Sequence, residues 1–395
     1  MTKVLRIINR LNLGGPTYNV AYLSKYLAPE FETLLVAGIK EDTEESSEFI
    51  VKKLGLSPYF IHEMRREINF KNDYRAYKKI KELIQDFKPD IVHTHAAKAG
   101  TLGRLAAIHS NVPVILHTFH GHVFHSYFNK YKTSIYKRIE RYLAHKSTGI
   151  IAISDIQKSE LLNEHRICTA EKIHVIPLGF DLSRFVQKPG VREKFRHVYN
   201  VDNDTLLIGI IGRLVPIKNH ELFIRSFSDV KRSLPEKKIK AMVIGDGEDM
   251  NKILALCSEL GLVIGKSGQY DIDADIIFTS WILEIEEALQ ALDIVALTSL
   301  NEGTPVSLIE AQASGTAIVS TDVGGISNVV IPGKSAFLSQ SNDIQSFSLN
   351  MTKLIMDDNL RNSVALEGRD FVLSRFGYER LVEDTKKLYR KLLEN

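Results

Sequence analysis

The stretch LLIGII at 206–211, which runs directly into Gly212 and Arg213, decides the fold. It is a short β-branched run that ends in a glycine, as a buried strand does before a loop and a helix. Similar runs follow it at 241–244, 276–278, 294–297 and 317–320, separated by segments with helical periodicity. This alternation predicts a doubly wound α/β domain around a mostly parallel sheet.

The same alternation is present upstream, so we expect two such domains. The upstream runs are 4–8, 33–37, 91–93, 114–116, 149–153 and 173–176. A length of 395 residues also suits two cores better than one. We place the first domain at 1–180 and the second at 181–377, with a hinge near 178–204. The last segment, 378–395, is expected to be one amphipathic helix that needs a surface to pack on.

Composition excludes several classes of protein. No apolar run approaches the roughly 18 residues of a membrane span, and Arg6 and Arg10 interrupt the N-terminal stretch, so we expect a cytoplasmic protein. A formal net charge of +3 argues against nucleic acid as a partner. Cys168 and Cys257 have no ligand-spaced neighbours, which argues against a disulfide framework and a zinc site.

Two loops that follow strands carry groups suited to phosphate. Gly14 and Gly15 come after the first strand, where two glycines let backbone amides approach a phosphate; the alternative is a simple turn. Gly212, Arg213 and Lys218 follow the first strand of the second domain. They could neutralise a diphosphate leaving group without a metal; the alternative is a solvated loop with incidental charges.

The segment 301–311 predicts an anion site at a helix start. Thr304 has the character of an N-cap, and Pro305 suits the first helical position. Val306 and Ser307 would then present free amides at the positive end of the helix.

Two carboxylates flank this helix start. Glu302, beside Gly303 in the preceding loop, could accept hydrogen bonds from sugar hydroxyls, and Glu310 could reach a ribose diol. The alternative is that Glu302 only stabilises the helix start and that Glu310 is an exposed helix residue.

In combination these motifs resemble the retaining glycosyltransferases of family four in the glycosyltransferase-B superfamily, of the bacterial surface-polysaccharide type. The resemblance implies two facing Rossmann-like domains, a C-terminal helix that crosses back onto the first domain, a nucleotide-sugar donor and no metal or other cofactor. It covers nearly the whole chain and rests on an ordered set: Gly14-Gly15, HTFHGH at 117–122, IPLGFD at 176–181, Gly212-Arg213 with Lys218, GDG at 245–247, and the pair Glu302 and Glu310.

The resemblance also implies roles for single residues. The catalytic set is His120, Glu302, Arg213 and Lys218, of which the last two bind the donor diphosphate. Glu310 binds the ribose, and His120 and Glu302 lie around the transferred sugar. The donor-binding set is Gly14, Gly15, Gly212, Arg213, Lys218, Trp281, Gly303, Thr304, Pro305, Val306, Ser307 and Glu310.

One donor-side loop departs from the family pattern. Where the family usually has a glycine after the strand that ends at Phe278, this chain has Ser280 and Trp281. Trp281 could contact the nucleobase; hydrophobic packing is the alternative.

Three residues are assigned to the acceptor side. His95 and Lys98 belong to a sub-pattern that resembles bacterial members with a His-Gly-His motif, and His122 closes that motif here. Lys98 could meet a phosphate; the alternative is a solvent-facing lysine at a helix start.

A metal site is not expected. Asp271 and Asp273 form an Asp-x-Asp pattern, but it precedes a strand outside any nucleotide-binding context, so we interpret it as an acidic surface loop. The histidines near the strand ends are expected to form hydrogen bonds rather than bind a metal.

The expected reaction is transfer, with retention, of a hexose or N-acetylhexosamine from a UDP-linked donor to a hydroxyl of a glycan or a polyprenyl- or lipid-linked acceptor. The family analogy favours front-face displacement, in which the departing phosphate oxygen takes the acceptor proton. Two alternatives remain: a nucleotide-sugar 2-epimerase of the same fold, and a catalytically silent nucleotide-sugar-binding protein.

The segment 129–146 predicts a helix with an apolar and a basic face. We expect the apolar face to pack on the sheet and the basic face to attach the protein peripherally to anionic membrane, without apolar insertion. The alternative is a solvated basic face. The apolar set is Tyr131, Ile135, Ile139, Tyr142 and Leu143; the basic set is Lys130, Lys137 and Arg141, with Lys132, Arg138 and Lys146 around them.

Overall fold

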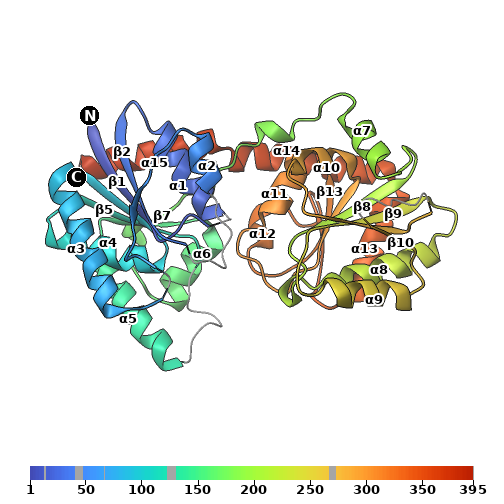
Figure 1. Ribbon diagram of the computed structural model, residues 1–395, viewed down its shortest axis with the longest axis horizontal. Coiled ribbons are helices and arrows are strands. Elements are labelled where there is room, and N and C mark those ends of the chain that lie inside the picture. The colour runs from blue at the N-terminus through green and yellow to red at the C-terminus, as the bar shows by residue number, and fades with distance from the viewer. Residues whose placement is uncertain (13–14, 41–47, 66, 122–129, 267–272, 395) are drawn as a thin grey trace. The chain divides into compact units, whose positions relative to one another are not determined.

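The computed structural model describes residues 1–12, 15–40, 48–65, 67–121, 130–266 and 273–394. The chain divides into two compact units. Unit 1 is Met1–Phe180 with Phe376–Asn395, and unit 2 is Asp181–Arg375. Each unit has a seven-stranded parallel sheet with helices on both faces, so the predicted doubly wound α/β architecture is confirmed (Figure 1).

Unit 1 has the strand order β3-β2-β1-β4-β5-β6-β7, with every neighbouring pair parallel. The order reverses between β1 and β4. Its strands are β1 (Thr2–Ile8), β2 (Phe31–Gly38), β3 (Tyr59–Ile61), β4 (Ile91–His95), β5 (Val114–Phe119), β6 (Gly149–Ala152) and β7 (Ile173–Val175). Its helices are α1 (Gly15–Tyr26), α2 (Glu48–Lys53), α3 (Phe70–Phe87), α4 (Ala97–His109), α5 (Lys130–Lys146), α6 (Asp155–Ser159) and α15 (Tyr378–Leu393).

Unit 2 has the order β10-β11-β9-β8-β12-β13-β14, again parallel throughout, and reverses between β8 and β12. Its strands are β8 (Leu206–Ile211), β9 (Ile239–Ile244), β10 (Ile264–Lys266), β11 (Ile276–Ser280), β12 (Ile294–Leu297), β13 (Ala317–Thr321) and β14 (Phe337–Ser339). Its helices are α7 (Val191–Val198), α8 (His220–Ser233), α9 (Met250–Glu259), α10 (Ile285–Ala291), α11 (Val306–Ala313), α12 (Ile326–Val329), α13 (Ile344–Met356) and α14 (Asp358–Phe376).

The sequence pattern missed β3, β10 and β14. Each has three residues and lies at the edge of its sheet. The central strands read as continuous apolar runs because both of their faces are buried under helices. A three-residue edge strand shows such a run only weakly, and of the four such strands only β7 was predicted.

The C-terminal helix α15 belongs to unit 1. Leu381, Val382, Leu388 and Tyr389 share a hydrophobic core with strands β1, β4 and β5 and with helix α1. Gly179 permits the close approach, because a Cβ there would lie 2.6 Å from the Cβ of Leu381. The expected amphipathic helix is therefore an integral part of the first domain's core.

Helix α5 is rotated relative to the prediction, which was wrong about its packing face. The side chains of Ile135, Ile139 and Tyr142 are 42%, 38% and 51% exposed. The predicted packing residues thus form an outward stripe at positions i, i+4 and i+7, and Leu143 alone of the described set is buried. The side chains of residues 130–132 lie outside the described part.

A buried ion pair accounts for this rotation. Arg104 of α4 is fully buried, and its Nη2 lies 2.6 Å from Oε2 of Glu140. An unpaired guanidinium in the core would be costly, so α5 must present Glu140 inward. Leu143 and Ala144 follow one turn later on the same face and complete the contact. Hydrophobic periodicity alone gave no signal for this electrostatic requirement.

Candidate functional site

The loops after β8, β9 and β11 pack tightly at the carboxyl edge of the unit 2 sheet. A Cβ on Gly245 would lie 2.0 Å from the carbonyl oxygen of Gly212, so only glycine fits there. The amide of Gly245 donates to the carbonyl of Ser280 at 3.0 Å. Because open parallel sheets bind ligands at this edge, beside the reversal of strand order, this is the expected place for a site.

Lys218 and Glu302 are brought together here, although the sequence gave them separate roles. Lys218 Nζ lies 2.5 Å from Glu302 Oε1, and Ser299 Oγ donates to the same oxygen at 2.6 Å. The amide of Leu300 donates to the carbonyl of Ile217 at 2.8 Å, which joins the loop after β12 to the loop after β8. Glu302 therefore orients the Lys218 ammonium beside the end of β8.

The loop after β13 holds the backbone of Glu302 in position. The amide of Gly325 donates to the carbonyl of Glu302 at 2.9 Å, and a Cβ on Gly325 would lie 1.7 Å from the carbonyl oxygen of Gly303. Gly324 has φ of 53°, a conformation that favours glycine. Two consecutive glycines thus fix the backbone from which Glu302 projects.

Helix α11 begins one residue later than predicted. Pro305, expected at the first helical position, is the N-cap with ψ of 91°, and Thr304 therefore lies outside the helix. No side chain accepts a hydrogen bond at this helix start. The first-turn amides of Val306 and Ser307 have no intrahelical carbonyl to bond, so they remain suited to an anion.

Glu310 lies one turn into α11 and is half-buried. Burial raises the pKa of its carboxyl group to about 7. Arg184 opposes this shift in pKa, and Glu286 reinforces it. Arg184 itself forms an ion pair with Glu286, with 2.7 Å between Nη2 and Oε2. Glu310 is thus poised to change charge near neutral pH.

Arg213 and Trp281 project from the same edge of the sheet. Arg213 is exposed, and within the described ranges its guanidinium forms no hydrogen bond or ion pair. Trp281 is 48% exposed. The residue before it, Ser280, has φ of 59°, the left-handed conformation in which a glycine is ordinarily favoured. The backbone at Ser280 thus has the conformation that suits the glycine usual in the family at this loop.

In unit 1 the corresponding edge carries a buried polar cluster. Arg6 of β1 is fully buried; its Nη1 lies 3.0 Å from Nδ1 of His93 and 3.2 Å from Nε2 of His95, and its Nη2 donates to the hydroxyl of Tyr389 at 3.0 Å. His95 Nδ1 lies 2.9 Å from Nε2 of His120. Burial lowers the pKa values of His93 and His95 well below the usual range and that of His120 to about 3, so all three imidazoles are neutral.

The structure shows the surroundings of three predicted site residues of unit 1, namely His95, Lys98 and Gly15. His95 was expected to face the acceptor, but its ring is fully buried and both of its nitrogens are bonded. Lys98 is not the solvated lysine of the alternative, because its Nζ lies 2.6 Å from Oδ1 of Asp73; its phosphate contact stays a prediction. Gly15 opens α1, and a Cβ there would lie 2.8 Å from Leu178 Cδ1, so a larger residue would have to displace that leucine methyl group. Gly14 and His122 lie outside the described residues.

Arg6 and Tyr389 were missed by sequence reasoning. Arg6 was noted only as an interruption of an apolar stretch. A charged residue inside a buried strand is itself a signal, because it must find polar partners in the core. The partnership with Tyr389 joins residues 383 positions apart and has no local signature.

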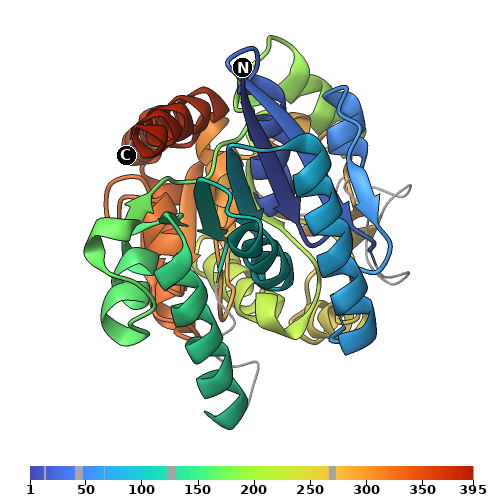
Figure 2. The same ribbon diagram turned by 90° about the vertical axis from the view of Figure 1, so that its left-hand side faces the viewer.

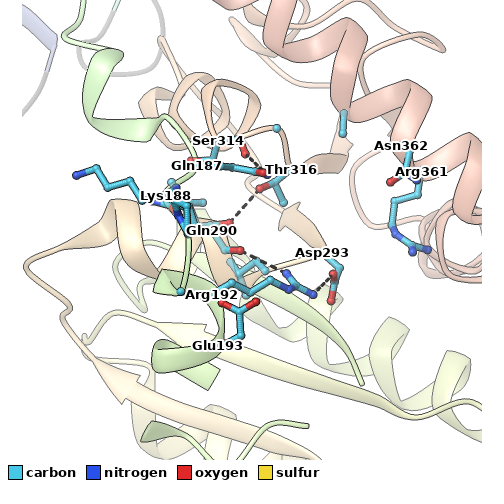
Figure 3. Close-up of a pocket in the computed structure, with 16 residues that line it drawn as sticks. Gln187, Lys188, Arg192, Glu193, Gln290, Asp293, Ser314, Thr316, Arg361 and Asn362 are labelled. Carbon is cyan, nitrogen blue, oxygen red and sulfur yellow. Dashed lines mark hydrogen bonds and ion pairs between the residues drawn. The ribbon is translucent and has the colours of Figure 1, made fainter. Parts of the chain in front are cut away.

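A separate pocket of about 530 Å³ lies at the opposite edge of the unit 2 sheet (Figure 3). Asp293 and Thr316, which line it, immediately precede β12 and β13. One of its carboxylates is paired: Oδ1 of Asp293 lies 2.6 Å from Arg192 Nη2, and its other oxygen bonds the neighbouring Arg196 at 2.7 Å. Asp293 therefore has a structural role in this pocket.

The structure tests the expectation about a metal site only in the part of the chain that it describes. Among the residues that the structure describes, no group of three His, Cys, Asp or Glu side chains is placed to hold a metal ion. Asp271 lies outside those residues, so the Asp-x-Asp pattern is untested.

Comparison with known proteins identifies the family. Residues 13–184 match the family model for Glycosyltransferase Family 4, and residues 191–371 match the model for Glycosyl transferases group 1. The chain belongs to these glycosyltransferases. The resemblance to these glycosyltransferases that the motifs indicated is thereby confirmed.

Similar curated proteins act on bacterial glycans. The chain is 29% identical over 342 residues to the UDP-Gal:alpha-D-GlcNAc-diphosphoundecaprenol alpha-1,3-galactosyltransferase of Escherichia coli, covering 85% of this chain and 84% of that protein. It is 25% identical over 343 residues to the capsular polysaccharide biosynthesis glycosyltransferase CapM of Staphylococcus aureus, covering 84% of each.

Solved structures agree on the fold. Anabaena HepE, crystallised in complex with UDP, superposes with a TM-score of 0.81 at 17% identity, over 99% of this chain and 100% of that chain. WaaG, a glycosyltransferase involved in lipopolysaccharide biosynthesis, gives a TM-score of 0.68 at 14% identity, over 98% and 99% of the two chains.

The left-handed backbone at Ser280 generates a stability prediction. We expect Ser280→Gly to raise the free energy of unfolding by about 1 kcal/mol, because glycine removes the Cβ cost of that conformation. Ser280→Ala, which keeps the Cβ and loses only the hydroxyl, is the matched control and is expected to give no gain. Urea denaturation of the three proteins measures this; equal gains in both variants would contradict the backbone explanation.

Proposed function

We propose that this glycosyltransferase transfers a hexose or N-acetylhexosamine, with retention and without a metal ion, from a UDP-sugar to a hydroxyl acceptor. The observation that carries the proposal is the convergence of anion-binding groups at the carboxyl edge of the unit 2 sheet. There the unpaired Arg213, the oriented Lys218 and the free amides of Val306 and Ser307 come from loops on either side of the β8/β12 reversal. Two cations and a helix start are suited to the charge that develops on a departing diphosphate.

Each donor group has a separate role in this proposal. Arg213 and Lys218 bind the diphosphate, Glu310 accepts hydrogen bonds from the ribose diol, and Trp281 borders the base. Glu302 holds Lys218 in the free protein and accepts hydrogen bonds from sugar hydroxyls once the diphosphate attracts that ammonium. The exchange keeps each charge partnered before and after binding.

Retention is proposed to follow front-face displacement. The departing phosphate oxygen takes the proton of the acceptor hydroxyl, that hydroxyl oxygen forms the new bond to the anomeric carbon, and the bond from that carbon to the diphosphate breaks. The protein then contributes positioning and electrostatic stabilisation rather than a nucleophile.

The acceptor is proposed to be a glycan intermediate on a polyprenyl or other lipid diphosphate. The printed name of the Escherichia coli relative contains both UDP-galactose and N-acetylglucosamine on diphosphoundecaprenol. These are the first donor and acceptor to test. Incubation of the protein with both should give a lengthened lipid-linked glycan in which the anomeric configuration, followed by NMR, is retained.

The same assay without acceptor separates the alternatives. A transferase leaves the nucleotide sugar intact or hydrolyses it slowly, whereas a 2-epimerase converts it to its epimer. An epimer, or an inverted product, would contradict the proposal. Binding of UDP-sugars with neither reaction, across a panel of acceptors, would favour the silent binding protein.

The diphosphate assignment predicts the effect of removing each cation. Arg213→Ala and Lys218→Ala should each lower kcat by about 10²-fold or more, as loss of a donor to a developing charge typically does. The matched control is Lys238→Ala, which breaks an exposed ion pair to Asp204 (2.7 Å) next to the amino end of β9. Steady-state kinetics with the UDP-sugar measure this; near-normal turnover in both site variants would remove the assignment.

The proposed contact of Glu310 with the ribose predicts that donor binding depends on pH. Its carboxylate is the form that accepts hydrogen bonds from a ribose, and with a pKa of about 7 that form is lost as the pH falls through neutrality. The donor KM should therefore rise by up to about tenfold one pH unit below the pKa, where about a tenth of the groups are ionised. In Glu310→Gln the donor KM should be raised and independent of pH in this range. A wild-type KM that does not change between slightly alkaline and slightly acidic pH would contradict the role.

We also propose that α5 attaches the protein to anionic membrane by inserting its apolar stripe. This amends the expectation from the sequence, which had the basic face make the contact alone. Within the described residues no helix is long and apolar enough to span a bilayer. In both views α5 extends beyond the neighbouring helices of unit 1 at its first turns (Figures 1 and 2).

The exposed side of α5 combines the two features of an interfacial helix. Ile135, Ile139 and Tyr142 form the apolar stripe, and the exposed Arg138 and Lys146 lie among them. Apolar side chains enter the headgroup boundary, and basic residues near an anionic surface contribute about 1 kcal/mol each. Arg141 has a structural role, because its guanidinium donates to backbone carbonyls of the 165–166 segment.

Vesicle co-sedimentation tests the amended proposal. Wild type should bind anionic vesicles, and less so at high salt. Ile135→Ser with Ile139→Ser should weaken binding, whereas Leu366→Ser with Leu373→Ser, at exposed apolar positions of α14, should not. Loss of binding only on Arg138→Glu with Lys146→Glu would restore attachment without insertion, and no binding by wild type would make α5 an ordinary surface helix.

A further inference from the structure

Three arginines are among the largest fully buried side chains, and one of them differs from the others in its partners. Arg104 bonds the carboxylate of Glu140, and Arg196 bonds that of Asp293. Arg6 has no carboxylate partner in the part of the chain that the structure describes; its bonds go to His93, His95 and Tyr389. Burying a cation without an anionic partner lowers the stability of the fold, so we expect Arg6 to have a functional role.

Arg6 fixes the direction of the hydrogen bonds that leave it. A guanidinium can only donate, so Nε2 of His95, whose bonded partner is Arg6, must accept. Since the His95 imidazole is neutral, its proton lies on Nδ1 and is donated to Nε2 of His120. His120, also neutral, must then carry its own proton on Nδ1.

That last nitrogen has no hydrogen-bond partner in the part of the protein that the structure describes. Nδ1 of His120 is buried and forms no hydrogen bond to any residue in the described ranges. The chain of donors therefore begins at a permanent cation and ends at one N–H group held ready for an oxygen acceptor. Successive hydrogen bonds in a chain polarise one another, which strengthens the final donor.

The C-terminal helix holds Arg6, at which this series of hydrogen bonds begins, in place. Tyr389 of α15 accepts from Arg6 Nη2 and lies 2.6 Å from His93 Nδ1. Burial raises the pKa of its phenol, so the hydroxyl keeps its proton and donates it to His93. His93 must then be protonated at Nε2, from which it donates to Thr118 Oγ1 at 2.7 Å. Neighbouring histidines on one strand thus take opposite tautomers.

We propose that Arg6 and His95 are positioning residues that hold His120 in its Nδ1–H tautomer, as a fixed hydrogen-bond donor to an oxygen of the transferred sugar. The choice of ligand rests on the proposed function; the tautomer does not. In this state His120 cannot act as a general base, because its free nitrogen already carries a proton and the other is occupied by His95. The acceptor proton must then go elsewhere, in agreement with transfer to the departing phosphate.

The direct test is the tautomer in the ligand-free protein. Long-range proton–nitrogen NMR on protein labelled with ¹⁵N-histidine distinguishes protonated from unprotonated ring nitrogens, and a His120→Asn variant assigns the His120 signals. We expect Nδ1–H for His95 and His120 and Nε2–H for His93. Nε2–H or a doubly protonated ring at His120 would overturn the inference whether or not the protein proves to be a transferase.

Variants of His95 separate positioning from packing. His95→Gln has a carbonyl to accept from Arg6 and an amide to donate to His120, so it should keep the His120 tautomer and most of the activity. His95→Leu can do neither; it should release His120 to a mixture of tautomers and lower kcat by about tenfold or more. Equal loss in both variants, with the His120 spectrum unchanged, would make His95 merely structural.

A buried histidine that takes no part in the hydrogen bonds from Arg6 to His120 serves as the control. His117 bonds Thr94 from the adjacent strand and has no bond to His120. His117→Gln should leave the His120 tautomer unchanged even if it lowers thermal stability. Arg6→Lys, which still can only donate, should preserve the tautomer as well. A changed His120 tautomer in His117→Gln would show that general loosening of the core, and not the hydrogen bonds that begin at Arg6, controls that tautomer.

Discussion

The parallel direction of every strand pair is the constraint on which the rest of the structure depends. In each unit all seven strands point the same way, so the loops that follow them gather at one edge of the sheet. Residues far apart in the chain thereby meet: Lys218 follows β8 and Glu302 follows β12, yet their side chains are in contact. At the amino edge, the Asp293 carboxylate of the polar pocket is instead held by Arg192 and Arg196.

Buried charge is the second organising feature. Arg104 draws Glu140 into the core and so turns α5, leaving an apolar stripe in water. Arg196 ties α7 to the segment before β12 through Asp293. Arg6 instead directs a chain of neutral imidazoles towards His120. The same residue type thus performs two structural tasks and one proposed functional task, distinguished by whether a carboxylate accompanies it.

The fold and the loops at the carboxyl edge of the unit 2 sheet could be predicted from the sequence because their signals are local. A buried central strand is a continuous apolar run, and the Gly-Arg and Glu-Gly-Thr-Pro segments follow such runs directly. The edge strands β3, β10 and β14 were missed because three residues show little pattern, and the Thr304 cap was misplaced because a helix boundary depends on backbone geometry at single residues. The rotation of α5 and the Arg6–Tyr389 bond were beyond reach, since both depend on partners in other elements. Ser280 shows a further case: it departs from the usual glycine of the family, yet the backbone has the conformation that glycine would favour.

The central claim is that the free amides at the start of α11 receive the donor diphosphate. Amide hydrogen exchange of Val306 and Ser307, measured with and without UDP, tests it most directly, because those first-turn amides have no intrahelical partner to protect them. The account predicts that UDP slows exchange at both amides while uridine, which lacks the diphosphate, does not, and that the first amides of α14 stay unchanged. Saturating UDP that leaves Val306 and Ser307 exchanging at their free rates would contradict the claim.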